Sequence, residues 1–178
     1  MNKRDLSISM ERGNLIALLL AVPIAIVQFL PFALFRQREI VITFDVLLIV
    51  LVGTLISIVI HEILHALTWI VAGRLPRSAV KFGIHRRTLS PYTHLKVPVR
   101  VNVYRLGTLM PGFVLGILPY VVALITGHVP LFMLSVLNTL SALGDGIILW
   151  LLRRVPPTVQ VEDHPNRIGC YVIESDPM

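Results

Sequence analysis

Four long apolar runs constrain this 178-residue chain more than any other feature of its sequence. They cover about residues 15–35, 44–72, 106–126 and 130–152. Each run is near or above the ~20 residues that a helix needs to cross the hydrocarbon core of a bilayer. The apolar residues also stand in continuous blocks rather than alternating along short strands, which favours helices. The sequence therefore predicts an all-α membrane protein, in which a bundle of four transmembrane helices forms one integral membrane domain over residues 1–178.

The composition excludes the two commonest alternatives to a membrane protein. Hydrophobic residues make up 55% of the chain, charged residues only 15%, and the mean hydropathy is +0.79. An average soluble domain carries about 25% charged residues, and a chain of this length has too little interior to bury so much apolar surface. The same figures exclude a disordered chain. The single cysteine, Cys170, rules out an intrachain disulfide and a cysteine-based zinc site.

The basic residues predict how the chain is oriented. The net charge of +6 indicates, in so hydrophobic a chain, basic loops on the cytoplasmic side of a membrane rather than a nucleic-acid partner. Residues 1–14, 73–105 and 153–178 hold 14 of the 16 Lys and Arg residues, and four crossings leave these segments on one side. We expect a multi-pass protein of a bacterial-type cell membrane, with both termini in the cytoplasm and a cytoplasmic tail over residues 153–178. The basic loop at 73–105 is typical of an anchor on membrane lipids, with a specific acidic partner as the alternative.

The second apolar run contains His61, Glu62 and His65 in the pattern HExxH. Ionisable residues inside a membrane helix are costly and are usually functional. Residues four apart lie on one helix face, so His61 and His65 can bind one Zn²⁺ ion together. Glu62 lies beside that face, where it can act as the catalytic general base. The alternative is a pair of histidines that are hydrogen-bonded within a helix bundle.

Zinc in a catalytic site needs a third protein ligand, and Asp145 is the only charged residue of the fourth run. His65 lies nine residues before Arg74, and Asp145 lies eight residues before Arg153. At the helical rise, both groups lie roughly 12–14 Å from the same membrane face. We therefore predict that His61, His65 and Asp145 bind the metal. The alternatives are that Asp145 pairs with a neighbouring helix, or that His94 folds back as the ligand.

Two polar residues of the fourth run share a helix stripe with Asp145. Asn138 and Ser141 follow the spacing i, i+3, i+7 together with Asp145, so they face the same way. They are candidates for hydrogen bonds to substrate or to the catalytic water. The alternative is that they are polar contacts that hold the helices together.

The loop between the second and third runs contains a segment with β periodicity. Residues 96–104 alternate polar and apolar side chains, which is typical of a half-buried strand. Pro98 confines such a strand to a sheet edge, and residues 78–84 are a candidate partner across a turn near Ser90 and Pro91. An edge strand beside a peptidase centre can hold an extended substrate by strand addition. The alternative is a strand that lies on the lipid headgroups.

Five segments follow one another along the chain: the HExxH run, Pro91–His94, Met110–Gly112, Gly144–Asp145 and Asp163–Pro165. In this order they resemble the putative zincin peptidase family, a bacterial group. The resemblance covers roughly residues 40–175. It implies a zinc-dependent, membrane-embedded metallopeptidase that hydrolyses peptide bonds of peptides or membrane proteins at or within the membrane.

The arrangement is also similar to the site-2 protease class of intramembrane metalloproteases. Those enzymes have HExxH in one membrane helix and an aspartate in a later helix as the third ligand, a place that Asp145 would take. The chain departs from that class because it has Gly144-Asp145-Gly146 instead of the usual Asn-Pro and Leu-Asp-Gly motifs. The rival hypothesis is a non-catalytic membrane scaffold or regulatory protein that binds a metal.

Overall fold

The computed structural model describes residues 2–36, 41–85 and 90–174. Within these residues, three helical stretches are long and apolar enough to cross a membrane, and a bent pair of helices makes a fourth if it forms one crossing. These features are those of a membrane protein, and they match the four predicted runs. The structure also contains β-sheet, so the all-α prediction was wrong in that respect.

The first two long helices are continuous. They are α1 (Met10–Arg36) and α2 (Phe44–Gly73). Thr43 caps the start of α2, because its hydroxyl accepts from the Val46 amide at 3.4 Å. Arg74, in the left-handed conformation with φ 50°, caps its end. Most large apolar side chains of both helices are exposed, as expected for helices whose outer faces contact lipid.

The third stretch is interrupted by a π-helix. It consists of α3 (Val101–Pro111), the π-helical η2 (Gly112–Ile117) and α4 (Leu118–Thr126). Pro111 has no amide hydrogen, so it cannot donate the α-helical hydrogen bond to the carbonyl of Gly107, four residues earlier. Pro119 likewise stands in the first turn of α4. The two prolines therefore bracket the stretch where the regular α-helix is broken.

The fourth stretch bends where the sequence predicts one straight run. It consists of α5 (Val129–Ser141) and α6 (Leu143–Leu152), which meet at an angle of 45°. The break falls at Ala142, so Asp145 stands in the first turn of a new helix. Broken helices at membrane depth are tolerated where they line a cavity inside the protein.

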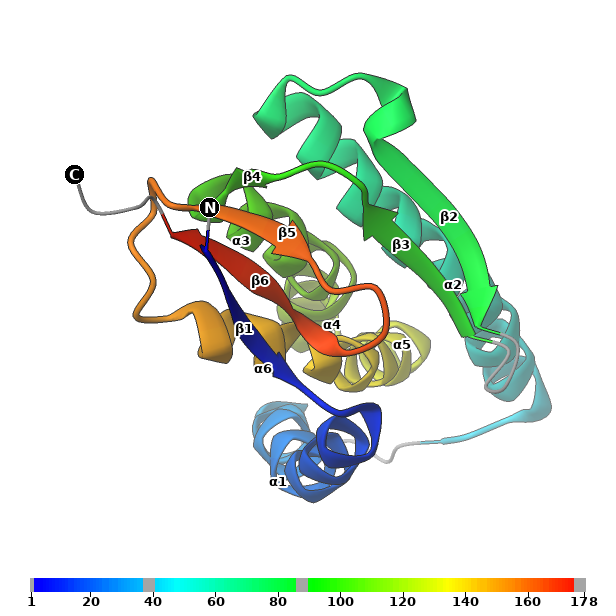
Figure 1. Ribbon diagram of the computed structural model, residues 1–178. Coiled ribbons are helices and arrows are strands. Elements are labelled where there is room, and N and C mark those ends of the chain that lie inside the picture. The colour runs from blue at the N-terminus through cyan, green and yellow to red at the C-terminus, as the bar shows by residue number, and fades with distance from the viewer. Residues whose placement is uncertain (1, 37–40, 86–89, 175–178) are drawn as a thin grey trace.

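The segments outside the long helices form a four-stranded antiparallel sheet with the order β1-β6-β5-β4 (Figure 1). The strands are β1 (Asn2–Ile8), β4 (Val99–Arg100), β5 (Gln160–Asp163) and β6 (Ile168–Glu174). The segment predicted as a tail thus supplies the two inner strands. In Figure 1 the sheet lies across the ends of the later helices, with the N-terminal strand at its edge.

A β-hairpin between α2 and α3 confirms that β structure separates these helices. After a 3₁₀ turn, η1 (Arg77–Ala79), the strands β2 (Val80–His85) and β3 (Ser90–Leu95) pair antiparallel. Of the strand predicted at residues 96–104, only Val99 and Arg100 form one, β4 at the edge of the sheet, because the chain turns into α3 at Val101. Its predicted partner pairs with β3 instead. Backbone hydrogen bonds from Val101 to Val159 (2.8 Å) and from Asn102 to Pro157 (3.2 Å) fix the turn into α3.

One apolar cluster joins the sheet, the hairpin and the nearby helix ends. Tyr104, Leu95, Val101 and Val161 in it are each at most 1% exposed. Burial of such side chains is the main favourable contribution to folding. The cluster fixes the sheet and the hairpin against α2, α3 and α6, the helices that carry the candidate site.

Candidate metal centre

His61, His65 and Asp145 come together between α2 and α6. The Nε2 atoms of the two histidines lie 3.2 Å apart. Asp145 Oδ2 lies 3.2 Å from His61 Nε2, and Asp145 Oδ1 lies 3.4 Å from His65 Nε2. One ligand atom from each residue falls within 4.8 Å of the others. The structure thus brings together the three residues that the spacing and the helix depth point to.

A backbone carbonyl sets the protonation of His65. The Nδ1 atom of His65 lies 2.9 Å from the carbonyl oxygen of Gly107, which can only accept, so Nδ1 carries the hydrogen. In the neutral ring the lone pair is then on Nε2, which faces the other two ligand atoms. Because Pro111 cannot donate to this carbonyl, the oxygen of Gly107 is available to accept a hydrogen bond from His65. This arrangement is typical of histidines that bind metals.

Stacked rings hold His65 from the other side. Trp69 stacks on His65 with the ring centroids 5.4 Å apart, and Tyr104 stacks on Trp69 at 5.5 Å. The Trp69 indole also donates to the carbonyl of Tyr104 at 3.2 Å. A side chain at Gly107 would overlap the Trp69 ring, so glycine is required where α3 crosses α2. His65 is therefore fixed in position by α3.

The residues present fit a zinc ion. Oδ2 of Asp145 is buried and has no hydrogen-bond partner, which is costly for a carboxylate oxygen. Its contact with His61 is close enough for an ion pair but is not a hydrogen bond. Two imidazole nitrogens and one carboxylate oxygen are one of the ligand sets of catalytic zinc sites, which leave a fourth position open.

His61, His65 and Asp145 line a cavity of about 190 Å³. Glu62 lines it as well, and its backbone carbonyl accepts a hydrogen bond from the Thr93 hydroxyl at 3.0 Å. The HExxH glutamate is thus held by the hairpin beside the candidate ligands. Other polar or aromatic residues that line the cavity are Trp69, Tyr92, Thr93, Tyr104, Thr108, Ser141 and Asp163.

Asp163 is a site residue that the residue patterns did not single out. Its Oδ1 accepts from the Tyr104 hydroxyl at 2.6 Å, while its Oδ2 contacts His94 Nδ1 at 2.9 Å and accepts from the Leu95 amide at 3.2 Å. The hydrogen bond with this carboxylate raises the pKa of His94. Asp163 lies in β5, so only the pairing of distant strands brings it to the cavity.

The remaining predicted residues lie at different places. His94 contacts Asp163, and within the described part of the chain it does not join the three candidate ligands. Ser141 lines the cavity, and its hydroxyl donates to the carbonyl of Asn138 at 2.9 Å. Asn138 is buried in α5, where its amide donates to the carbonyl of Leu134 at 2.8 Å, and it is not among the residues that line the cavity.

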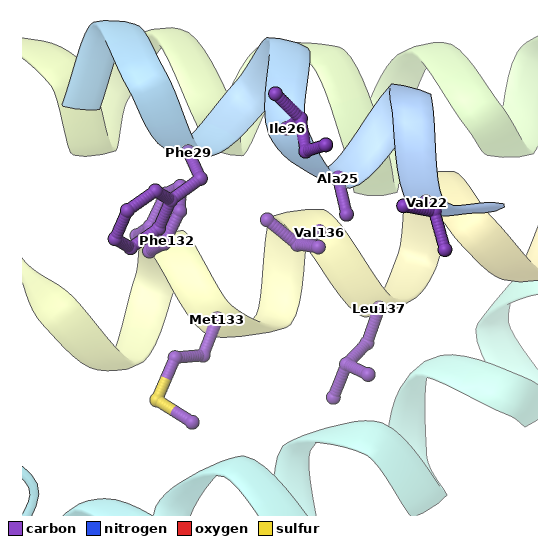
Figure 2. A pocket seen from close by; sticks show the side chains of 8 residues that line it. All are labelled: Val22, Ala25, Ile26, Phe29, Phe132, Met133, Val136 and Leu137. Atoms are coloured by element: carbon purple, nitrogen blue, oxygen red, sulfur yellow. The ribbon is translucent and has the colours of Figure 1, made fainter. Parts of the chain in front are cut away.

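A separate cavity of about 470 Å³ lies between α1 and α5 and contains no candidate ligand. Figure 2 shows that it is lined by apolar side chains of both helices, with Phe29 lying against Phe132. The centroids of these two rings are 6.3 Å apart. The apolar lining of this cavity is typical of a groove that faces lipid. The candidate ligands line the cavity of about 190 Å³ instead.

Comparison with known proteins gives one match. A sequence model of the family described as "Putative zincin peptidase" matches residues 54–159, which is more than half of the chain. The match includes Glu62 and the three candidate ligands, and it ends before Asp163. No curated protein and no solved structure matches the chain. On this match, the chain belongs to the putative zincin peptidase family.

Proposed function

We propose that this protein is a zinc-dependent, membrane-embedded metallopeptidase that hydrolyses peptide bonds at or within the membrane. The observation that carries the proposal is the convergence of His61, His65 and Asp145 at a cavity that Glu62 also lines. Membership of a zincin peptidase family supports a metallopeptidase. The apolar length of the helices supports a location in the membrane.

The roles of the residues follow from their positions. His61, His65 and Asp145 would hold the zinc ion, which would supply a Lewis acid that polarises a carbonyl and lowers the pKa of a water to about 7. Glu62 takes a proton from the attacking water at its carboxylate and passes it to the leaving amine. The carbonyl of Gly107 keeps His65 in the tautomer that presents Nε2 to the site.

The breaks in the long helices support a site that water can reach. The π-helix η2 and the bend between α5 and α6 both interrupt helices around the cavity. We expect water and substrate to enter from the cytoplasmic side, which the charge distribution places nearest to the site. Membrane lipids surround the helices in this proposal, and the substrate is a peptide or a membrane protein. In helix order the arrangement is similar to that of site-2 proteases.

Glu62→Gln tests the proposed mechanism. The amide keeps the shape of the side chain but cannot take the proton, so peptide hydrolysis should fall by about 10²-fold or more. Zinc content should stay at the wild-type level, because Glu62 is not a ligand. The purified protein is assayed in detergent micelles with a quenched fluorescent peptide, and zinc is measured by mass spectrometry. The control is Glu174→Gln, an exposed glutamate of β6. Full hydrolysis by Glu62→Gln would contradict the mechanism.

The rival function is a scaffold that binds zinc without catalysis. A structural zinc site is closed by four protein ligands, whereas the described residues bring only three candidate ligands together. The open fourth position therefore favours catalysis. Wild-type protein that carries zinc but hydrolyses none of a varied peptide set would favour the scaffold.

A further inference from the structure

A third cavity, of about 460 Å³, opens between α2 and the β-hairpin, beside the candidate metal centre. We name it the hairpin pocket. Figure 1 shows the two hairpin strands running alongside α2. Among the residues that the structure describes, Glu62 is the only charged one that lines the pocket. The lining residues are Val59, Glu62 and Ile63 of α2, and Phe82, Gly83, Ile84, Pro91 and Tyr92 of the hairpin.

The hairpin pocket adjoins the cavity at the candidate metal centre. Glu62 and Tyr92 line both cavities. The hydrogen bond from the Thr93 hydroxyl to the carbonyl of Glu62 holds the hairpin against α2 at this point. A group that fills the hairpin pocket is therefore next to the proposed general base.

One glycine allows the wall of the pocket to form. Gly83 pairs with Tyr92 in the hairpin, and a side chain at Gly83 would overlap the Tyr92 ring. The ring therefore packs over Gly83, and Tyr92 forms part of the lining of both cavities. Phe82 and Ile84, on either side of Gly83, are 56% and 65% exposed. Large apolar side chains are thus left uncovered around the entrance of the pocket.

An extended peptide fits a pocket with apolar walls and one carboxylate better than a lipid chain does. A hydrocarbon chain cannot form a hydrogen bond with the carboxylate of Glu62, and burying this charge beside the chain is unfavourable. In an extended peptide, neighbouring residues lie 3.8 Å apart and point their side chains to alternate sides. A peptide whose scissile bond lies at Glu62 thus places an adjacent side chain within reach of the hairpin pocket.

We propose that the hairpin pocket is a specificity pocket, which takes a large apolar side chain, such as Phe or Leu, of the substrate residue next to the scissile bond. The assignment rests on the proposed peptidase function. Apolar walls select such a side chain by removing it from water. An acidic side chain is rejected because it would lose its hydration and meet the carboxylate of Glu62.

The test measures peptide binding and peptide cleavage separately. Fluorescent ten-residue peptides of Gln and Ser carry Phe, Ala or Glu at one position, and the purified full-length protein is held in detergent micelles. Binding is read by fluorescence anisotropy with a zinc chelator present, so that no cleavage interferes. The wild-type protein should bind the Phe peptide at least about tenfold more tightly than the Ala peptide, and the zinc-loaded protein should cleave it with the same preference.

Phe82→Lys should change the preference from the Phe peptide to the Glu peptide, because it places a positive charge at the pocket. The matched control is Val41→Lys, an exposed apolar residue outside the cavities described above, which should leave the preference unchanged. Phe82→Ala is a second variant that adds no charge. It should weaken binding of the Phe peptide by about tenfold without favouring the Glu peptide.

Two results would overturn the specificity pocket. One is equal binding of the three peptides by the wild-type protein, and the other is an unchanged preference for Phe in both Phe82 variants. A lipid in the pocket would produce the second result. Binding that follows the Phe82 variants, without cleavage by the zinc-loaded protein, would support the pocket and contradict the peptidase function instead.

Discussion

Pro111 influences the candidate metal centre although it is not one of the candidate ligands. Its missing amide hydrogen leaves the carbonyl of Gly107 available to His65, 2.9 Å away. A helix-breaking residue thereby fixes which nitrogen of a histidine faces the site. The carbonyl belongs to the class of hydrogen-bond partners that orient metal-binding histidines and whose loss weakens metal binding.

Pro111→Ala should therefore weaken zinc binding. Alanine restores an amide hydrogen that competes with His65 for the carbonyl of Gly107, and loss of such a partner costs about 10- to 100-fold in metal affinity. The affinity is measured by competition with a fluorescent zinc chelator. Pro31→Ala, in the distant helix α1, is the control and should bind zinc like the wild type. Unchanged affinity in Pro111→Ala would show that this carbonyl does not orient His65.

At the scale of elements, the long helices were predictable and the sheet was not. An apolar run is a local signal, so the helix around His61 and His65 could be located to within a residue at each end. β1 pairs with β6 from the far end of the chain, and β4 has only two residues. The pairing of distant strands leaves no local pattern, and the alternation at residues 96–104 corresponds to only the two residues of β4. The C-terminal segment was therefore predicted as a tail rather than as sheet.

The residues of the candidate site that lie on the long helices were predictable, and the others were not. His61, His65 and Glu62 follow from one helix motif, and Asp145 follows from its depth in another apolar run. Asp163 could not be assigned a role, because its contacts depend on where β5 lies. The 45° bend before Asp145 was also missed, since no proline or charge marks it. Local patterns thus gave the residues on helices, and long-range pairing supplied the rest.

Asp163 links three elements, and this link should make stability depend on pH. The Asp163 carboxylate raises the pKa of His94 above its usual 6.5 in the folded protein. The stabilisation is therefore fully present below pH 6.5 and is lost as the pH rises through the raised pKa. The melting temperature of the wild type should fall over that interval because of this pair.

Asp163→Asn should flatten this part of the curve and lower the melting temperature most on its acidic side. The comparison is a series of melting curves in detergent micelles between pH 5.5 and pH 8.5, about one unit below and two units above the usual pKa of histidine. Asp5→Asn, a change in the exposed strand β1, is the control and should keep the slope of the wild type. An equal slope in Asp163→Asn would show that the pair does not set the pH dependence.

At the scale of the whole molecule, one sheet gathers the three segments that carry most of the basic residues. β1 comes from the N-terminal segment, β4 from the segment between α2 and α3, and β5 and β6 from the C-terminal segment. Strands of one sheet must lie on the same side of a membrane, because an exposed sheet edge cannot cross it. The sheet thus supports the even number of crossings that the charge distribution predicts.

This topology can be tested with a membrane-impermeant maleimide. Single cysteines are introduced at Lys3, Val41 and Thr158 in the otherwise unchanged protein. Cys170 is buried, and burial raises its pKa to about 12, so the native thiol should stay unreactive. Lys3→Cys and Thr158→Cys should be labelled only from the cytoplasmic side, and Val41→Cys only from the opposite side. Labelling of Lys3→Cys and Thr158→Cys from different sides would contradict the shared sheet.

The central claim is that His61, His65 and Asp145 hold zinc, and the zinc content of the purified protein tests it most directly. Mass spectrometry should find about one zinc per chain in the wild type, as one three-ligand site requires. His61→Ala should retain less than about a tenth of that, because two ligands cannot hold the ion against a chelator wash. His164→Ala, a histidine that contacts Tyr171 in the C-terminal segment, should match the wild type. Equal zinc in His61→Ala and the wild type would contradict the metal centre.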